Sequence, residues 1–296
     1  MLAALLLPLL PCACTRIIST GEKPEVWLRF DPVLISATKA EEAPGEYPAG
    51  TPFGVSVWEY AAGGEATGGS VLLADTRITC REGEWTPEPG VLWPGEEQEL
   101  AVLAYAPFGR AAAIDQQEGI QFQGVDMEKE QTELLYTDFR EGLTRDHGGV
   151  VNLPFRHALA YVDFSLRTNA MASQKVEVRG IRLLSLYTKG SFHSLPQPEW
   201  TLSDAAHSVS FFTGKQEVIA ENKVVSGSGA WVLPQIIQST VEVSLDFTAG
   251  GITSNLTLTS EPLVKRFEDG RHYTIVLSYL PEVNKLELDE TLHHVL

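Results

Sequence analysis

The sequence predicts an all-β protein built from two β-sandwich domains in tandem. Many short segments alternate apolar and polar side chains with the period of two that strands have, and turn residues separate them at near-regular spacing. Almost no segment repeats its apolar residues with the period of a helix. The 296 residues are enough for two domains of ordinary size, and a hydrophobic content of 44% is enough for a core.

The N-terminus predicts a lipoprotein signal. Residues 2–10 form an apolar run that is too short to span a bilayer as a helix and has the length of a signal-peptide core. Cys14 follows the small residue Ala13, as at a bacterial lipoprotein cleavage site, whereas the other nearby cysteine follows a proline. No Lys or Arg precedes the run, which departs from the signal pattern, and the alternative is a frayed apolar tail. We expect a signal peptide over residues 1–14, a lipid on Cys14 and a linker over residues 15–23.

The first domain is expected to span residues 24–148 and to begin with an alternating segment. Val26, Leu28 and Phe30 lie on one side of this segment. Pro32 interrupts it, which suits an edge strand or a bulge because proline lacks the N–H that a sheet needs. An apolar run resumes after the proline, and a polar loop rich in Pro and Gly follows. Further strands are expected over residues 53–60, 71–73, 77–80 and 100–106, and a short helix over residues 128–135.

The second domain is expected to span residues 149–296, after a polar hinge that contains glycines. Its first strand is predicted within residues 150–166, where apolar and polar side chains alternate from Ala158 on and Phe164 faces the core. Residues 241–259 predict the strongest hairpin, because an Ala-Gly-Gly turn separates two alternating segments. Further strands are expected over residues 176–178, 181–184, 231–233, 273–280 and 283–288.

The composition argues against nucleic-acid binding, metal binding and catalysis. The 22 Lys and Arg residues against 39 Asp and Glu residues give a net charge of −17, so a phosphate backbone would be repelled. The sequence has no phosphate-binding glycine loop, no zinc-spaced cysteine pair and no nucleophile elbow. His147 and His157 are therefore interpreted as structural. We expect no enzyme activity, no cofactor and no metal site.

Cys80 would be the one cysteine left after lipidation and signal removal. A single cysteine cannot form an internal disulfide, so the core and the sheets must hold the fold. We expect Cys80 to be a small, buried, apolar residue.

The run Leu153-Pro154-Phe155-Arg156-His157-Ala158-Leu159-Ala160 resembles the central signature of the fimbrillin family, the lipoprotein-derived pilins of Bacteroides-type bacteria. Further matches follow in the expected order, at residues 47–55, 100–107, 233–235 and 273–277. The resemblance implies two transthyretin-like sandwich domains and a structural subunit of a cell-surface fimbria. It also implies export as an outer-membrane lipoprotein and assembly with other pilin subunits by strand exchange. In that process a protease removes the first strand, and the terminal strand of a neighbouring subunit fills the groove.

The resemblance also assigns site residues. The removed strand would be residues 26–35, with a donor strand at residues 283–296. The apolar positions of the removed strand would be Val26, Leu28, Phe30, Val33 and Ile35. The family usually has an Arg before an Ala at the cleavage site, whereas here Lys39 precedes Ala40, and an Arg-selective pocket should discriminate against Lys. We expect cleavage between Lys39 and Ala40. The alternatives are cleavage at Arg29, or an uncut and lipidated anchor or terminal subunit.

A different function stays open at this point. The protein could be a surface lipoprotein that binds a glycan or a host ligand without polymerising. A sugar would then stack on aromatic side chains of the first domain. The candidates are Trp58, Tyr60, Trp85 and Trp93. Such residues more often belong to a sandwich core or cover its edge.

Overall fold

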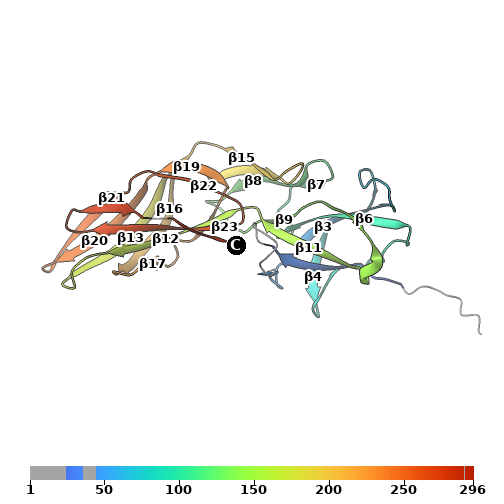
Figure 1. Cartoon of the computed structure of the whole chain (residues 1–296), viewed down its shortest axis with the longest axis horizontal. Coiled ribbons are helices and arrows are strands. Elements are labelled where there is room, and N and C mark those ends of the chain that lie inside the picture. The colour runs from blue at the N-terminus through green and yellow to red at the C-terminus, as the bar shows by residue number, and fades with distance from the viewer. Residues whose placement is uncertain (1–24, 36–44, 290) are drawn as a thin grey trace, which may run out of the picture.

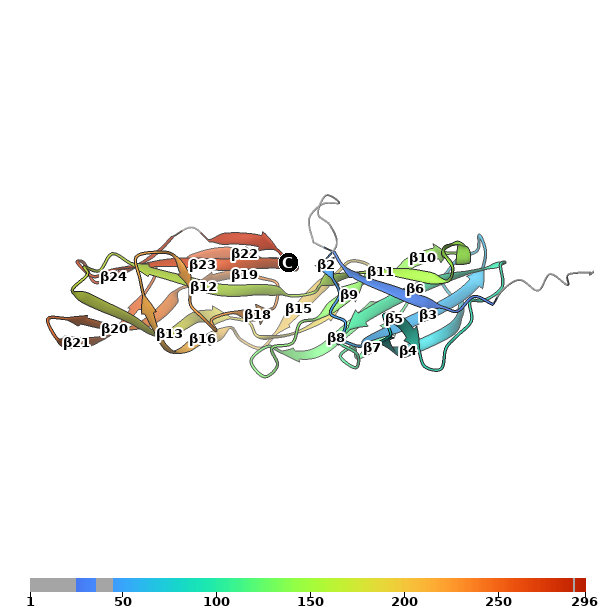
Figure 2. The same ribbon diagram turned by 90° about the horizontal axis from the view of Figure 1, so that it is seen from below.

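The computed structural model describes residues 25–35, 45–289 and 291–296. These residues form an elongated protein made of β-sheets (Figures 1 and 2). Their one helix is the short 3-10 turn η1 (Arg145–His147). The predicted all-β sandwich class is confirmed. No helix in the described ranges has both the length and the apolar character needed to cross a membrane.

The first half of the chain forms a nine-stranded sheet that closes on itself. Its strands are β1 (Arg29–Leu34), β2 (Gly45–Glu46), β3 (Phe53–Ala61), β4 (Ser70–Arg81), β5 (Glu84–Pro87), β6 (Gln98–Ala106), β9 (Leu135–Thr137), β10 (Arg140–Leu143) and β11 (Val150–His157). They follow the order β10-β6-β3-β4-β5-β1-β11-β9, and β2 pairs with β1. Because β9 also pairs with β6, the sheet encloses an apolar interior that contains Phe53, Val102 and Phe155.

Strand β6 shows why this sheet is apolar on both faces. Leu100, Val102 and Ala104 point into the enclosed interior. Leu103 and Tyr105 point outwards, where a second sheet covers them. Successive side chains of a strand face opposite sides, so a strand that is covered on both sides reads as a continuous apolar run.

The second sheet joins the two halves of the chain. It contains β7 (Ala113–Asp115), β8 (Gly119–Asp126), β14 (Lys189–His193) and β15 (Glu199–Ser203) in the order β15-β14-β8-β7. Strand β8 of the first half pairs with β14 of the second half, and the rings of Phe122 and Phe192 stack with their centroids 5.6 Å apart. This four-stranded unit, called the bridging sheet below, therefore ties the halves together.

The second half is a sandwich of sheets around one apolar core. One sheet contains β12 (Ala160–Thr168), β17 (Lys223–Val224), β18 (Ala230–Val232), β23 (Arg271–Leu280), β24 (Lys285–Leu288) and β25 (Leu292–Val295). The facing sheet contains β16 (His207–Val218), β13 (Gln174–Leu186), β20 (Val241–Ala249) and β21 (Ile252–Thr259), and a two-stranded ribbon contains β19 (Gln235–Ser239) and β22 (Leu263–Phe267). Phe164, Val243 and Ile275 are fully buried between them. The predicted hairpin over residues 241–259 is confirmed as β20 and β21.

The predicted first strand of the second domain forms two strands. Strand β11 pairs with β1 and β9 and so belongs to the closed sheet, whereas β12 pairs with β23 in the sandwich. The chain crosses between them at Ala158 and Leu159. The Ala158 N–H donates to the Leu134 carbonyl, and the Leu159 carbonyl accepts from the Gly270 N–H. The division into domains after residue 148 stays a prediction, because the bridging sheet contains strands from both sides of it.

The helix predicted over residues 128–135 is absent, so this prediction is wrong. The segment forms a turn and extended chain that leads into β9. The Gln131 side chain accepts a hydrogen bond from the Trp231 N–H, and Glu128 pairs with His207. These contacts with the second half hold the segment in an extended conformation, so tertiary structure overrides the local preference.

Candidate functional site

Strand β1 is inserted between two strands from other parts of the chain. It runs parallel to β11 in register from Arg29 to Leu34, and it pairs antiparallel with β5 at Phe30 (Figure 2). Strand β2 adds to β1 beyond β5 and pairs with it at Val33. Removal of β1 would therefore expose the edges of both β5 and β11, and unpaired strand edges bind other strands readily.

One face of β1 contributes to the enclosed core. Leu28 and Phe30 are 1% and 3% exposed, and Val26 and Leu34 pack against the same core. The ring of Phe30 meets that of Phe53 edge-on at 6.1 Å between centroids. The strand thus carries an alternating row of apolar side chains that fill the core.

Two residues of the predicted removable strand lie outside the enclosed core. Val33 and Ile35 are half-buried and do not pack in the enclosed core. The buried Pro32 and the core-facing Leu34 take the inward positions instead. Strand β1 continues through Pro32 without a break, so the even-numbered residues stay on the inner side after the proline.

The surroundings of Pro32 explain why β1 tolerates a proline. The N–H of Leu28 donates to the chain that follows β5, and the N–H of Arg29 donates to the residue before β11. Backbone N–H groups alternate along a strand, so position 32 faces the β5 side. On that side β1 pairs at Phe30 and next at Val33, and Pro32 has no registered partner there. The missing N–H therefore costs no sheet hydrogen bond.

The start of β1 is fixed by charge and close packing. Arg29 Nη1 lies 2.9 Å from Glu84 Oε1, and its Nη2 donates to the Gly148 carbonyl at 3.2 Å. Gly149 has a φ of +79°, and a side chain there would approach the Trp27 carbonyl oxygen to 2.4 Å. Only glycine suits this position, because it accepts a positive φ and leaves room for the chain that enters β1.

Other predicted site residues fall outside the described part of the chain. Cys14, Lys39 and Ala40 belong to residues 1–24 and 36–44, so lipidation and cleavage stay predictions. Cys80 is a free cysteine and is half-buried rather than buried.

The predicted donor segment forms two strands on one edge. Strands β24 and β25 both pair antiparallel with β23, at its end and its beginning respectively. Leu286 of β24 is buried in the sandwich core, whereas Leu292 of β25 is 46% exposed. Strand β25 is held by its backbone pairing and by ring contacts of His293 with Tyr273 and of His294 with His272.

The aromatic residues proposed for sugar stacking do not form an exposed platform. Trp58, Tyr60 and Trp93 are buried. Trp85 packs inside the enclosed core, with its ring 5.3 Å from that of Tyr47. Tyr47 was not among the predicted site residues, although it packs in the same enclosed core as Leu28 and Phe30. The sequence pointed to Tyr47 only through its position in the matched segment at residues 47–55.

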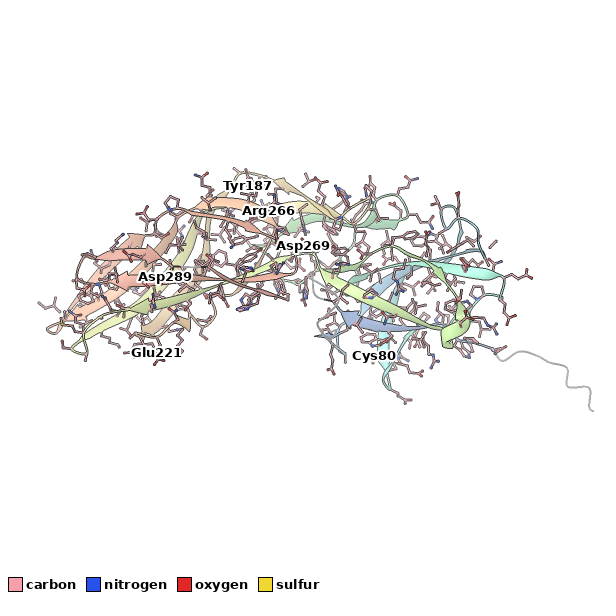
Figure 3. All side chains as sticks on the ribbon, viewed as in Figure 1. Cys80, Tyr187, Glu221, Arg266, Asp269 and Asp289 are labelled. Carbon is pink, nitrogen blue, oxygen red and sulfur yellow. The ribbon has the colours of Figure 1, made fainter. Side chains whose placement is uncertain are left out.

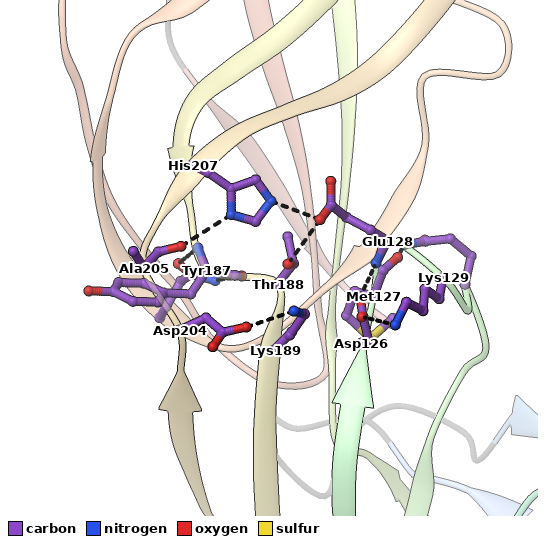
Figure 4. A network of polar contacts seen from close by, with 12 residues as sticks. Asp126, Met127, Glu128, Lys129, Tyr187, Thr188, Lys189, Asp204, Ala205 and His207 are labelled. Carbon is purple, nitrogen blue, oxygen red and sulfur yellow. Dashed lines mark hydrogen bonds and ion pairs between the residues drawn. The ribbon is translucent and has the colours of Figure 1, made fainter.

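A polar network holds the segment after β8 to the second half (Figure 4). His207 Nε2 lies 2.8 Å from Glu128 Oε2, and the Thr188 hydroxyl donates to the same oxygen at 3.4 Å. The hydrogen bond with the Ala205 carbonyl raises the pKa of His207, and the Glu128 carboxylate adds to this effect. Lys189 lies next to this group and forms an ion pair with an aspartate. These contacts join segments far apart in sequence and act as a clamp.

One of the two predicted structural histidines lies in a packed position. His157 is buried at the end of β11, with Nδ1 2.8 Å from Glu133 Oε1 and its ring stacked on Trp231. Within the described ranges, no three His, Cys, Asp or Glu side chains are grouped to hold a metal ion.

Comparisons with known proteins agree on one kind of protein. A family model described as fimbrillin-like matches residues 38–291. A fimbrial protein from Bacteroides vulgatus has a similar structure, with a TM-score of 0.61 and 14% identity over 91% of this chain and 99% of that chain. A candidate cell adhesion protein from Bacteroides ovatus aligns with a TM-score of 0.57 and 12% identity over 93% of this chain and 99% of that one. At such identities the likeness shows the fold. A search of curated proteins gave no match.

Proposed function

The chain belongs to the fimbrillin-like family, and on this premise we propose that it is a structural subunit of a cell-surface fimbria that assembles by strand exchange. The role is structural and needs no catalysis. The observation that carries the proposal is β1, which fills a slot between β5 and β11 and contributes alternate side chains to the core.

The position of β1 in the chain suits its removal. Lys39 lies in the connection between the end of β1 and the start of β2. A cut after Lys39 would separate β1 from the rest of the protein and leave every other described strand intact. After that cut, only side-chain packing and strand pairing would hold β1 in place.

The empty slot would be a strong acceptor for another strand. Full burial of a Leu or Phe side chain contributes about 1.5–3 kcal/mol. Loss of Leu28 and Phe30 would therefore cost roughly 3–6 kcal/mol, which an incoming strand with suitable side chains recovers. Main-chain hydrogen bonds to both open edges add affinity.

The donor proposed is the C-terminal segment of a neighbouring subunit. Its Leu286, Leu288 and Leu292 would share one face if the segment of the donor formed a single strand, with Glu290 between the last two. Strand β25 lies at a sheet edge with Leu292, His293 and His294 exposed, so its release from β23 would cost its backbone pairing and two ring contacts. Before maturation, a lipid on Cys14 would hold the precursor at the outer membrane.

Substitution of Lys39 tests the proposal. Lys39→Ala should block removal of residues 26–35 and abolish the polymer, and Lys39→Arg should speed maturation because it fits an Arg-selective pocket. The matched control is Lys129→Ala, which removes an exposed lysine from a different loop and should mature normally. The measurements are the N-terminal sequence of the mature surface protein, expected to start at Ala40, and its polymer size.

The state of residues 26–35 in the surface protein also shows when the proposal is wrong. A surface polymer whose subunits all keep residues 26–35 would rule out strand exchange through the β1 slot. An unpolymerised surface protein that keeps these residues would instead favour an anchor or terminal subunit.

A further inference from the structure

A cleft of about 510 Å³ lies where the two halves of the protein meet. The bridging sheet forms one wall, and the β19–β22 ribbon with the start of β23 forms the other. Arg266 and Asp269 lie at this junction, near the middle of the molecule (Figure 3). The residues of the cleft used in the argument are Arg156, Glu199, Trp200, Arg266, Asp269 and Arg271.

Charged side chains of both signs line the cleft. Three arginines, Arg156, Arg266 and Arg271, lie among three carboxylates, Glu199, Glu268 and Asp269. Arg156 forms an ion pair with Asp138 at 2.9 Å. The Arg266 side chain is exposed and has no hydrogen bond or ion pair with any residue that the structure describes. Arg266 is therefore the guanidinium available to an anion from outside.

The cleft also offers hydrogen-bond acceptors on a fixed turn. Asp269 is half-buried, and burial raises its pKa, with a further contribution from Glu268. The turn is held by two hydrogen bonds, from the Gly270 N–H to the Leu159 carbonyl at 2.9 Å and from the Glu268 N–H to the Tyr273 hydroxyl at 3.0 Å. These groups are in place before any ligand arrives.

An aromatic ring completes the cleft. Trp200 of β15 is half-buried, and its indole N–H donates to the Ala158 carbonyl at 2.7 Å. Its ring also lies 5.3 Å from that of Phe192 behind it. Both contacts fix the orientation of the indole, so it can present a flat apolar surface to a ligand.

We propose that this cleft binds a sugar that carries a carboxylate, such as a hexuronic acid. The apolar face of the sugar ring packs on Trp200, and its hydroxyl groups donate to Asp269 and Glu199. The carboxylate binds Arg266, whose planar guanidinium matches a carboxylate with two parallel hydrogen bonds. The cleft volume is within the range of small-ligand sites, about 300–1,000 Å³. This site goes beyond the fimbrial role, because a single subunit is enough to form it.

The test compares two sugars that differ in one group. The full chain is titrated with glucuronate and with glucose, and the indole N–H signal of Trp200 is followed by nuclear magnetic resonance. A Trp200→Phe spectrum identifies that signal. Hydrogen bonds to charged groups predict that glucuronate binds about tenfold to hundredfold more tightly than glucose.

Two arginine variants locate the carboxylate. Arg266→Gln should reduce glucuronate affinity to that of glucose and leave glucose binding unchanged. Arg182→Gln, which removes an exposed strand arginine on the far sheet, should change neither. Equal binding of the two sugars, glucuronate binding that Arg266→Gln leaves intact, or a Trp200 signal that neither sugar shifts would each overturn the proposal. None of these outcomes bears on strand exchange.

Discussion

Replacement of Phe30 by alanine should strongly destabilise the uncut protein. Phe30 is 3% exposed and packs edge-on against Phe53 inside the enclosed core. Loss of a fully buried phenylalanine ring costs about 3–5 kcal/mol, because the transfer free energy is lost and a cavity remains. The expected fall in the free energy of unfolding is therefore about 3–5 kcal/mol.

Val33→Ala provides a matched control on the same strand. Val33 is half-buried and lies outside the enclosed core, so its truncation should cost about 1 kcal/mol or less. Both variants are measured by urea unfolding of precursor that retains residues 26–35. Equal destabilisation by the two variants, or no change with Phe30→Ala, would show that β1 does not present its even-numbered residues to the core.

Three further predictions concern other parts of the chain. Phe164→Ala should lower the free energy of unfolding by about 3–5 kcal/mol, and unchanged urea unfolding would contradict the buried phase of β12. His207, whose pKa the Ala205 carbonyl and the Glu128 carboxylate raise, favours its protonated form in the folded state. Its contribution is therefore complete below a pH of about 6.5 and is lost as the pH rises through the raised pKa. The stability difference between wild type and His207→Gln should shrink with rising pH, and a growing difference would refute the clamp. Cys14→Ser should leave the protein unprocessed and outside the detergent phase, and partitioning like the parent would exclude lipidation.

Alternation was sufficient to predict strands that have one apolar face. Residues 158–166 were expected to direct Val162 and Phe164 to the core, and both are fully buried in β12. The hairpin of β20 and β21 was predicted for the same reason, since Val243 and Leu245 alternate with polar residues. Local patterning is informative here because burial on one face imposes the period of two.

Sequence alone could not show which surfaces are covered by distant segments. Trp58 and Tyr60 were candidates for sugar stacking, because the sequence does not show what covers their face of the strand. The bridging sheet helps to bury that face, and it includes a strand from the second half. Likewise, Arg266 and Trp200 are 66 residues apart in the chain, and only the fold places them in one cleft.

The passage of the chain through Ala158 and Leu159 has a mechanical consequence for the proposed filament. Tension from a neighbouring subunit would enter at the β1 slot, beside β11, and leave through the segment that follows β23. Strand β11 continues covalently into β12, and β12 pairs with β23 in register from Tyr161 to Thr168. These strands run along the length of the molecule (Figure 2), so a pull loads their hydrogen bonds in shear and all of them resist together. The subunit would thus transmit force along the covalent connection from β11 to β12 and through the hydrogen bonds between β12 and β23. The junction between the two halves would not act as a hinge.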